Sequence, residues 1–232
     1  MQRTLLITGA SRGIGLAMVR AAAGRGDRVI ACVRDPGSAA DLAAAARGAA
    51  PGAIAIRAAD VTDPASLAAA ALAEQGAIDV VVCNAGVYRA RGGIEAPGYT
   101  ADAWAETMMT NVAGVFFTVR AFLPHLERAP NPKIAIISSV MASSAKAPGG
   151  SYIYRASKAA ATNLARNLAT DLGPRGIAVG AYHPGWVRTD MGGTGAELDA
   201  ATSAAGLLAR FETLDLDTTG VFEDYRGTPI PY

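Results

Sequence analysis

Short β-branched runs alternate along this chain with longer Ala- and Leu-rich segments, and this alternation restricts the fold more than any other feature. The segments Ile78–Val82 and Ile134–Ile137 are almost continuously apolar, as expected of strands buried on both faces. Strands are predicted over residues 3–8, 28–33, 53–58, 78–83, 133–138 and 177–182. Helices are predicted over residues 13–25, 38–48, 64–75, 101–128 and 152–172.

Repeated strand–helix units favour right-handed crossovers and a parallel sheet. The predicted class is therefore α/β, a Rossmann-type doubly wound parallel sheet flanked by helices on both faces. The 232 residues suffice for one such domain, and neither a linker nor a repeat divides the chain. A single dinucleotide-binding catalytic domain is expected over residues 1–232. Residues 192–210 are expected to form a loop and a helix over the cleft.

A glycine-rich turn, Thr8–Gly15, joins the first predicted strand to the first predicted helix. Glycines let a pyrophosphate approach the backbone closely, and the helix N-terminus supplies free N–H groups and partial positive charge. The pattern therefore indicates dinucleotide binding, although a merely tight strand–helix turn would have the same glycines.

Tyr154 and Lys158 stand four residues apart in a predicted helix, so the phenol and the ammonium share one face. A neighbouring cation favours phenolate, so a lowered Tyr154 pKa is expected. Such a phenol serves as a general acid or base for carbonyl and alcohol chemistry. An ordinary exposed pair is the alternative. Tyr152, six residues before Lys158, is expected to face elsewhere.

These motifs resemble those of the short-chain dehydrogenase/reductase family along essentially the whole chain. The glycine spacing of Gly9, Gly13 and Gly15 is typical of that family, as is the Tyr154–Lys158 pair. Segment 149–158, segment 183–193 and the tail 220–232 are similar to the branch of carbonyl reductases that includes C-factor and Sniffer. The family's Asn-Asn-Ala-Gly segment appears here as Cys83–Gly86.

The resemblance implies functions for particular residues. The catalytic set would be Asn111, Ser139, Tyr154 and Lys158. The cofactor-binding set would be Gly9, Ser11, Arg12, Gly13, Ile14, Gly15, Arg34, Asp60, Val61, Asn84, Ala85, Gly86, Tyr154, Lys158, Pro184, Gly185, Val187 and Thr189.

Some of these assignments have rivals. The interval from Ser139 to Tyr154 exceeds the commonest family spacing, which leaves Ser138 and Ser143 as alternatives. Asn111 could instead bond to its own helix. Asp60 could instead cap the helix that begins at Pro64, although Asp63 fits that role better.

The residues after the second strand bear on the choice of cofactor. An acidic residue there usually binds the ribose of NAD, but the aligned position is Val33. Arg34 follows it, and Arg12 lies in the glycine turn, so two guanidinium groups could bind a 2′-phosphate. NADP(H) is therefore expected in preference to NAD(H). Two solvated arginines, or NAD binding through Asp35, are the alternatives.

Composition argues against nucleic-acid-binding, membrane-binding, disulfide-bonded and metal-binding proteins. A net charge of +1 offers no electrostatic basis for binding nucleic acid or an anionic membrane. Cys32 and Cys83 end apolar runs and are expected to be buried free thiols. Two histidines, His125 and His183, form no metal-ligand cluster, so no metal is expected. No targeting segment or membrane span is recognised, which predicts a cytoplasmic protein.

The predicted function is hydride transfer between NADP(H) and a small carbonyl or alcohol substrate, with reduction of a ketone or aldehyde favoured. Two alternatives are a cofactor-binding signalling or regulatory protein with incidental turnover, and an NAD-dependent alcohol dehydrogenase. Tyr88, Tyr152, Trp186 and Met191 are candidate walls of the substrate cleft, and core packing is the alternative for Trp186 and Met191. The family resemblance also makes a homodimer or homotetramer through helices 101–128 and 152–172 a candidate assembly.

Overall fold

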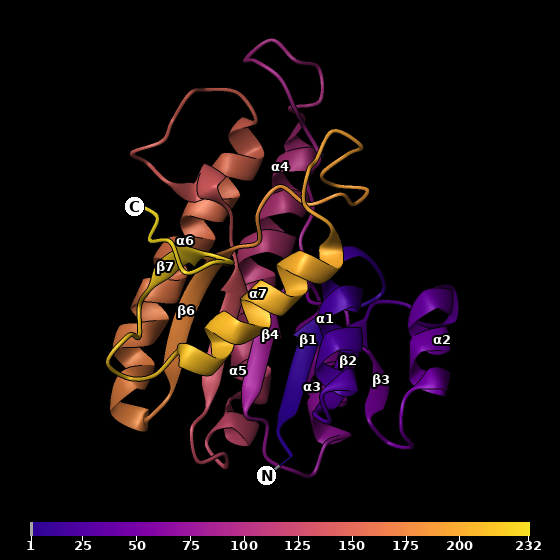
Figure 1. Cartoon of the computed structure of the whole chain (residues 1–232). Helices are drawn as coiled ribbons and strands as arrows, with labels where there is room; N and C mark the ends of the chain where they lie inside the picture. Colours follow the sequence, from indigo (N-terminus) through magenta and orange to yellow (C-terminus); the bar gives the residue numbers. More distant parts are fainter. Residues whose placement is uncertain (1) are drawn as a thin grey trace.

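The strands run parallel in one sheet, in the order β3-β2-β1-β4-β5-β6-β7 (Figure 1). This computed structural model describes residues 2–232. The strands are β1 (Thr4–Thr8), β2 (Arg28–Val33), β3 (Ile54–Ala58), β4 (Val80–Cys83), β5 (Lys133–Ile137), β6 (Ala178–His183) and β7 (Phe222–Asp224). The six predicted strands are confirmed to within two residues at each end. The short β7, which extends the sheet beside β6, was not predicted.

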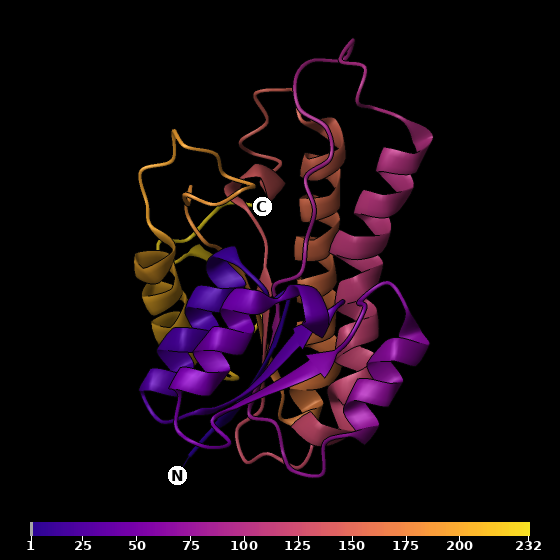
Figure 2. The same ribbon diagram turned by 90° about the vertical axis from the view of Figure 1, so that its right-hand side faces the viewer.

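Helices cover both faces of the sheet, as the doubly wound fold requires (Figure 2). One layer contains α1 (Gly13–Gly24), α2 (Ala40–Gly48) and α7 (Ala200–Thr213). The other contains α3 (Pro64–Leu72), α4 (Ala101–Met108), α5 (Gly114–Leu126) and α6 (Tyr152–Leu172). The chain reverses direction across the sheet between β1 and β4, where α/β folds of this kind bind ligands at the carboxyl ends of the strands.

Two apolar cores lie on the two faces of the sheet. Phe122 and Ile134 belong to the core beneath α3, α5 and α6, and Leu5 and Leu207 belong to the core beneath α1 and α7. Cys32 and Cys83 are buried free thiols in the first core, as predicted. Burial raises the pKa of both thiols to about 12, so they are inert packing residues.

The helix predicted over residues 101–128 is not continuous, which corrects that prediction. A π-helical segment, Met109–Ala113, separates α4 from α5. This widened turn coincides with a close approach to the end of β3, because a Cβ on Gly114 would lie 2.9 Å from Cγ2 of Val61. A π-bulge adds one residue to a turn, and such bulges are frequent at functional sites.

Helix α7 also differs from its predicted place. It packs against α1 on the sheet face, with Leu207 and Leu208 buried in the core, and does not cover the cleft. The predicted loop is present, because residues 184–198 are largely irregular and reach the carboxyl edge of the sheet.

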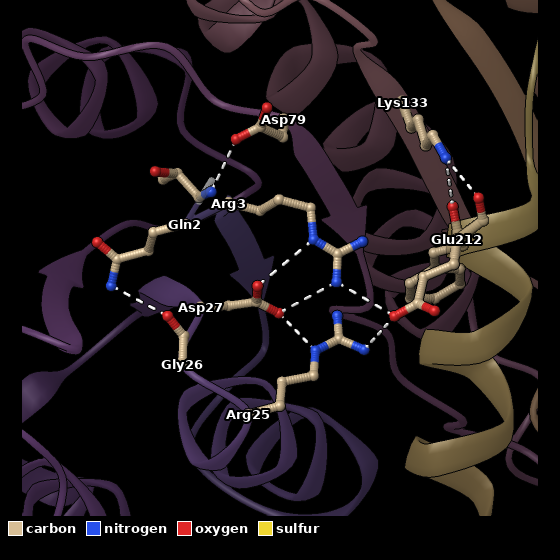
Figure 3. Close-up of polar contacts among 10 residues, drawn as sticks. Gln2, Arg3, Arg25, Gly26, Asp27, Asp79, Lys133 and Glu212 are labelled. Atoms are coloured by element: carbon tan, nitrogen blue, oxygen red, sulfur yellow. Dashed lines mark hydrogen bonds and ion pairs between the residues drawn. The ribbon is translucent and has the colours of Figure 1, made fainter.

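An ionic cluster joins the elements at the opposite, amino-terminal edge of the sheet (Figure 3). Arg3 and Arg25 both contact the carboxylates of Asp27 and Glu212. Nζ of Lys133 donates to the carbonyl of Glu212 at 2.8 Å, which ties β5 to the end of α7. These contacts hold β1, β2, α1 and α7 together far from the carboxyl edge.

Among residues 2–232, no helix has both the length and the apolar character needed to cross a bilayer.

Candidate active site

A cavity of about 490 Å³ opens at the carboxyl ends of β1 to β6. Most of the expected cofactor-binding residues line it: Gly9, Ser11, Arg12, Gly13, Ile14, Gly15, Arg34, Asp60, Val61, Asn84, Ala85, Gly86, Tyr154, Lys158, Pro184 and Thr189. Val187 does not, because it is buried and pairs with Leu198. Gly185 lines a second cavity, together with Trp186 and His183.

Glycines bring the turn after β1 close to the turn after β4. A Cβ on Gly9 would lie 2.8 Å from Cα of Ala85, and a Cβ on Gly15 would lie 2.3 Å from the carbonyl oxygen of Gly9. Nδ2 of Asn84 donates to the carbonyls of Thr8 and Gly9 at 2.9 and 3.1 Å. The two turns are therefore fixed against each other, and only glycine fits at both positions.

The first turn of α1 faces this cavity with its amide groups unsatisfied. No side chain of the described residues caps the helix, and its first turn contains no acidic residue. An anion is the natural partner for these amides and for the positive end of the helix dipole. The start of α1 is therefore suited to a phosphate.

Positive charge lies at the end of β2, where sequence reasoning places the adenosine ribose. Arg34 is exposed and lines the cavity, next to the buried Val33. The carboxylate of Asp35 accepts from the backbone N–H of Gly37 at 2.9 Å and caps a short 3-10 helix. Asp35 is therefore occupied locally and does not line the cavity. Arg12 donates to Asp190 at 2.9 Å, so it is not an isolated surface arginine.

Asp60 and Asp63 have separate functions after β3. Asp63 caps α3 by accepting from the N–H of Ala65 at 2.9 Å, as the sequence favoured. Oδ1 of Asp60 accepts from the N–H and the hydroxyl of Thr62 at 2.9 and 2.7 Å. Asp60 is thus held at the cavity wall and does not act as the cap.

Tyr154 and Lys158 project from one face of α6 into the cavity. The ammonium lies 5.7 Å from the centre of the phenol ring and donates to the carbonyl of Ile137 at 2.7 Å. Tyr152 faces away, as predicted, and packs edge-on against Tyr99. The two residues are buried, with 8% of Tyr154 and 5% of Lys158 exposed, so they are not an ordinary surface pair.

Burial raises the pKa of Tyr154 to about 12, which corrects the expectation of a lowered value. The neighbouring hydroxyl of Ser139 and the positive charge of Arg91 lower the pKa of Tyr154, but these effects are smaller. Burial also lowers the pKa of Lys158 to about 8. The expectation considered only the attraction between phenolate and ammonium, whereas desolvation penalises the charged form of each group.

Three serines, Ser138, Ser139 and Ser143, are candidates for the catalytic hydroxyl beside Tyr154, and their surroundings differ. The Ser139 hydroxyl lies close enough to Tyr154 to lower the pKa of the phenol, and it accepts from the N–H of Met141 at 3.1 Å. Ser138 lines the cavity, but its hydroxyl is paired with the hydroxyl of Thr162 at 2.6 Å, one turn further along α6 than Lys158. Ser143 is buried, and its hydroxyl has no partner among the described residues. The structure thus brings Ser139 to the phenol.

Asn111 lies in the π-helical segment, and its side chain forms hydrogen bonds with residues outside its own helix. It accepts from the N–H of Val87 at 2.8 Å and donates to the carbonyl of Val87 at 2.9 Å. It also donates to the hydroxyl of Ser157 on α6 at 2.9 Å. The alternative of bonding within its own helix is therefore wrong. A Cβ on Gly86 would lie 3.3 Å from Oδ1 of Asn111 and 3.5 Å from Nζ of Lys158, so both groups adjoin Gly86.

Aromatic and basic side chains lie beside Tyr154. Tyr88 stacks on Tyr154, with ring centres 4.2 Å apart and planes at 17°, and Arg91 lies over the Tyr88 ring. Trp186 is 61% exposed and Met191 is 37% exposed, so the alternative of core packing is wrong for both. Of the four candidate walls of the cleft, Met191 lines the main cavity, Trp186 lines the second cavity, and Tyr88 and Tyr152 line neither. Arg91 was not predicted, although its position in the irregular segment after Asn84-Ala85-Gly86 made it a candidate.

Among residues 2–232, no cluster of His, Cys, Asp or Glu could hold a metal ion. Nε2 of His125 is bonded to the carbonyl oxygen of Glu74 at 3.0 Å, and His183 lines the second cavity.

A model of the short chain dehydrogenase family matches residues 3–198. The chain belongs to this family. The C-signal protein of Myxococcus xanthus is 39% identical to it over 161 residues, which cover 68% of this chain and 94% of that protein. As a short-chain dehydrogenase, the chain also resembles solved carbonyl reductases.

One of these is an NADPH-bound carbonyl reductase from chicken fatty liver, with a TM-score of 0.92 and 32% identity over 100% of this chain and 99% of that one. Another is the carbonyl reductase Sniffer of D. melanogaster, with a TM-score of 0.92 and 27% identity over 100% of both chains. The predicted family, its carbonyl reductase branch and the fold are thus confirmed.

Proposed function

We propose that this short-chain dehydrogenase is an NADP(H)-dependent reductase of ketones or aldehydes. The observation that carries the proposal is the burial of Tyr154 and Lys158 in the wall of the cavity, with Ser139 next to Tyr154. A phenol whose pKa is about 12 stays protonated at neutral pH, so it is suited to give a proton to a carbonyl oxygen.

The residues present fit a nicotinamide dinucleotide. The turn at Gly9 and Gly15 has no room for side chains, and the start of α1 has free amides for a pyrophosphate. Asp60 and Val61 would hold the adenine, and Pro184 and Thr189 would lie beside the nicotinamide, as the family resemblance implies. Gly185 and Val187, which do not line the cavity, would support that segment from behind.

Preference for NADP(H) over NAD(H) rests on charge at the end of β2. The cavity wall there contains Arg34 and the apolar Val33, and Arg12 lines the same cavity. A guanidinium group forms charge-assisted hydrogen bonds with a phosphate, whereas a ribose hydroxyl gains little from it. The NADPH bound by the chicken carbonyl reductase agrees with this preference.

When bound, the reduced cofactor supplies hydride to the carbonyl carbon. The Ser139 hydroxyl donates a hydrogen bond to the substrate oxygen and stabilises the negative charge that develops on it. The Tyr154 hydroxyl gives its proton to that oxygen. Lys158 binds the nicotinamide ribose and favours the resulting phenolate. Asn111 holds Val87 and Ser157 in place around this centre, and we infer that it joins Lys158 to solvent.

The test is a steady-state assay of a panel of ketones and aldehydes with NADPH and with NADH. Wild-type protein should turn over at least one carbonyl, with a higher kcat/KM for NADPH. Tyr154→Phe should lower kcat by about 10²–10⁴ and keep NADPH affinity, because only the proton is removed. Near-wild-type turnover by the Phe variant would contradict the mechanism.

Arg34→Gln separates the two cofactors. The variant should bind NADPH about 10-fold or more weakly, while its affinity for NADH changes little. Arg20→Gln is the matched control, because Arg20 is an exposed arginine of α1 that does not line the cavity. Equal affinity of the wild-type protein for NADH and NADPH would exclude the preference.

The similarity to C-signal favours a second candidate, a signalling protein in which cofactor binding matters and turnover is incidental. The two candidates differ in what Tyr154→Phe does to a cell that depends on this protein. A reductase loses its cellular function in that variant, whereas a signalling protein that needs only the bound cofactor keeps it.

A further inference from the structure

Arg91 and Tyr154 both contact the ring of Tyr88, and Tyr154 lines the cavity. The guanidinium carbon of Arg91 lies 4.3 Å from the centre of the Tyr88 ring, and the Tyr154 ring lies 4.2 Å from the same centre. Both groups therefore lie against the Tyr88 ring, which joins Arg91 to the proposed acid.

The charge of Arg91 has no carboxylate partner among residues 2–232. Its one hydrogen bond runs from Nη2 to the carbonyl of Met191 at 2.5 Å, which leaves other N–H donors of the guanidinium free. Two other arginines of this region are neutralised: Arg89 is paired with Glu106, and Arg12 is paired with Asp190. Arg91 thus supplies unbalanced positive charge.

This charge lies next to the wall of the site. Met191, which binds the Arg91 side chain, lines the main cavity. Arg91 is also one of the charges that lower the pKa of Tyr154, so its field reaches the phenol. A substrate whose carbonyl meets Tyr154 therefore passes close to an unpaired guanidinium group.

The loop that carries Arg91 is held firmly to the start of α6. The N–H of Ser151 donates to the carbonyl of Gly92 at 3.0 Å, and the hydroxyl of Tyr99 donates to the same carbonyl at 2.7 Å. The hydroxyls of Ser151 and Tyr88 are 2.5 Å apart.

Within residues 2–232, Ser151 is the one non-glycine residue with a positive φ, at 52°. A serine in this conformation is disfavoured unless its surroundings hold it, which these bonds do. The position of Arg91 relative to Tyr154 is thus defined by the fold.

We propose that Arg91 binds a carboxylate on the carbonyl substrate, so that the enzyme prefers oxo acids to uncharged carbonyl compounds of the same shape. The inference rests on the proposed reductase function and names the class of its substrate. An aromatic or planar substrate would add contact with Tyr88. A guanidinium group suits this task because its planar fork matches the two oxygens of a carboxylate.

The experiment compares 4-carboxybenzaldehyde with benzaldehyde, a matched pair that differs in one negative charge. Wild-type protein should show a kcat/KM at least 10-fold higher for the carboxylated aldehyde. Arg91→Gln should reduce that ratio by about 10- to 100-fold, and Arg91→Lys should retain part of it because the charge remains.

Arg89→Gln is the matched control. It removes one positive charge from the same loop, two residues away, and should leave the ratio of the two aldehydes unchanged. A wild-type ratio near one, or a ratio that Arg91→Gln does not alter, would overturn the inference and leave the proposed reductase function standing.

A binding measurement separates failure of the inference from failure of the proposed function. The NADPH complex is titrated with 4-carboxybenzyl alcohol and with benzyl alcohol, followed by the fluorescence of the reduced nicotinamide. If neither aldehyde is reduced but the carboxylated alcohol binds in an Arg91-dependent way, the anion site stands and the reductase function is wrong. If neither aldehyde is reduced and the two alcohols bind alike, the anion site is overturned too.

Discussion

The guanidinium of Arg12 donates to the carboxylate of Asp190 at 2.9 Å and thereby joins the glycine turn to the segment after β6. Each side chain is 76% exposed, and both residues line the cavity. An exposed pair of this kind contributes little to stability, so Arg12 can exchange this carboxylate for a phosphate at small cost.

Asp190→Asn should therefore tighten NADPH binding by about 2- to 5-fold, because Arg12 is released and a negative charge is removed from the cavity. The measurement is a fluorescence titration of NADPH at low salt, where screening is weak. Asp171→Asn, the same charge change at an exposed position on α6, is the control and should have no effect. Unchanged or weaker binding by Asp190→Asn would show that the pair does not compete with the cofactor.

Ser139→Ala should lower kcat by about 10²–10³, as loss of a hydrogen-bond donor to a developing oxyanion does. Ser143→Ala should keep kcat within a few-fold, because the Ser143 hydroxyl is buried without a partner among the described residues. Both variants are compared at saturating NADPH. A severe loss in Ser143→Ala together with a mild one in Ser139→Ala would reverse the assignment.

Lys158 gives the stability of the protein a pH dependence. Burial lowers its pKa from 10.5 to about 8, so the folded state binds fewer protons than the unfolded state between these values. Stability from this group therefore rises with pH in that window. Relative to Lys158→Met, the wild-type protein should gain roughly 2 kcal/mol, or about 4–8 °C in Tm, between about pH 7 and pH 9.5.

Thermal unfolding of the two proteins across this range tests the point, because the Met variant cancels the pH dependence of every other group. A difference in Tm that stays constant, or that moves the other way, would mean that Lys158 keeps an ordinary pKa in the fold.

Gly15→Ala should destabilise the protein by about 2 kcal/mol or more and weaken cofactor binding, because the new Cβ would lie 2.3 Å from the Gly9 carbonyl oxygen and 2.6 Å from Nδ2 of Asn84. Gly24→Ala, at the other end of the same helix, is the control. No heavy atom lies within 4 Å of its new Cβ, so it should be neutral or slightly stabilising. The free energy of unfolding of both variants is measured by chemical denaturation. Equal losses of stability in the two variants would contradict crowding at Gly15.

The strand positions could be predicted from the sequence because most of the strands are buried on both faces and therefore appear as short, continuous apolar runs. Val80–Cys83, for example, is apolar on both faces and is therefore easily recognised as a buried strand. Asp63 and Pro64 likewise mark the start of α3. The three-residue β7 lacked such a pattern, and its pairing with β6 depends on the tertiary fold.

Other features depend on contacts that no local pattern records. The π-helical segment at Asn111 has an ordinary helical sequence, and the bulge becomes apparent only beside Val61, Val87 and Ser157. The raised Tyr154 pKa follows from burial that the spacing of Tyr154 and Lys158 does not reveal. The position of Arg91 over Tyr88 depends on how an irregular loop meets the start of α6.

The ionic cluster of Arg3, Arg25, Asp27 and Glu212 has a practical consequence for protein engineering. It lies at the amino ends of the strands, about 15 Å of β1 away from the chemistry at their carboxyl ends. Directed evolution can therefore adjust heat tolerance and substrate range with separate mutant libraries. Gains selected at one end need not be traded against the other, so a variant improved at both can be assembled by simple recombination.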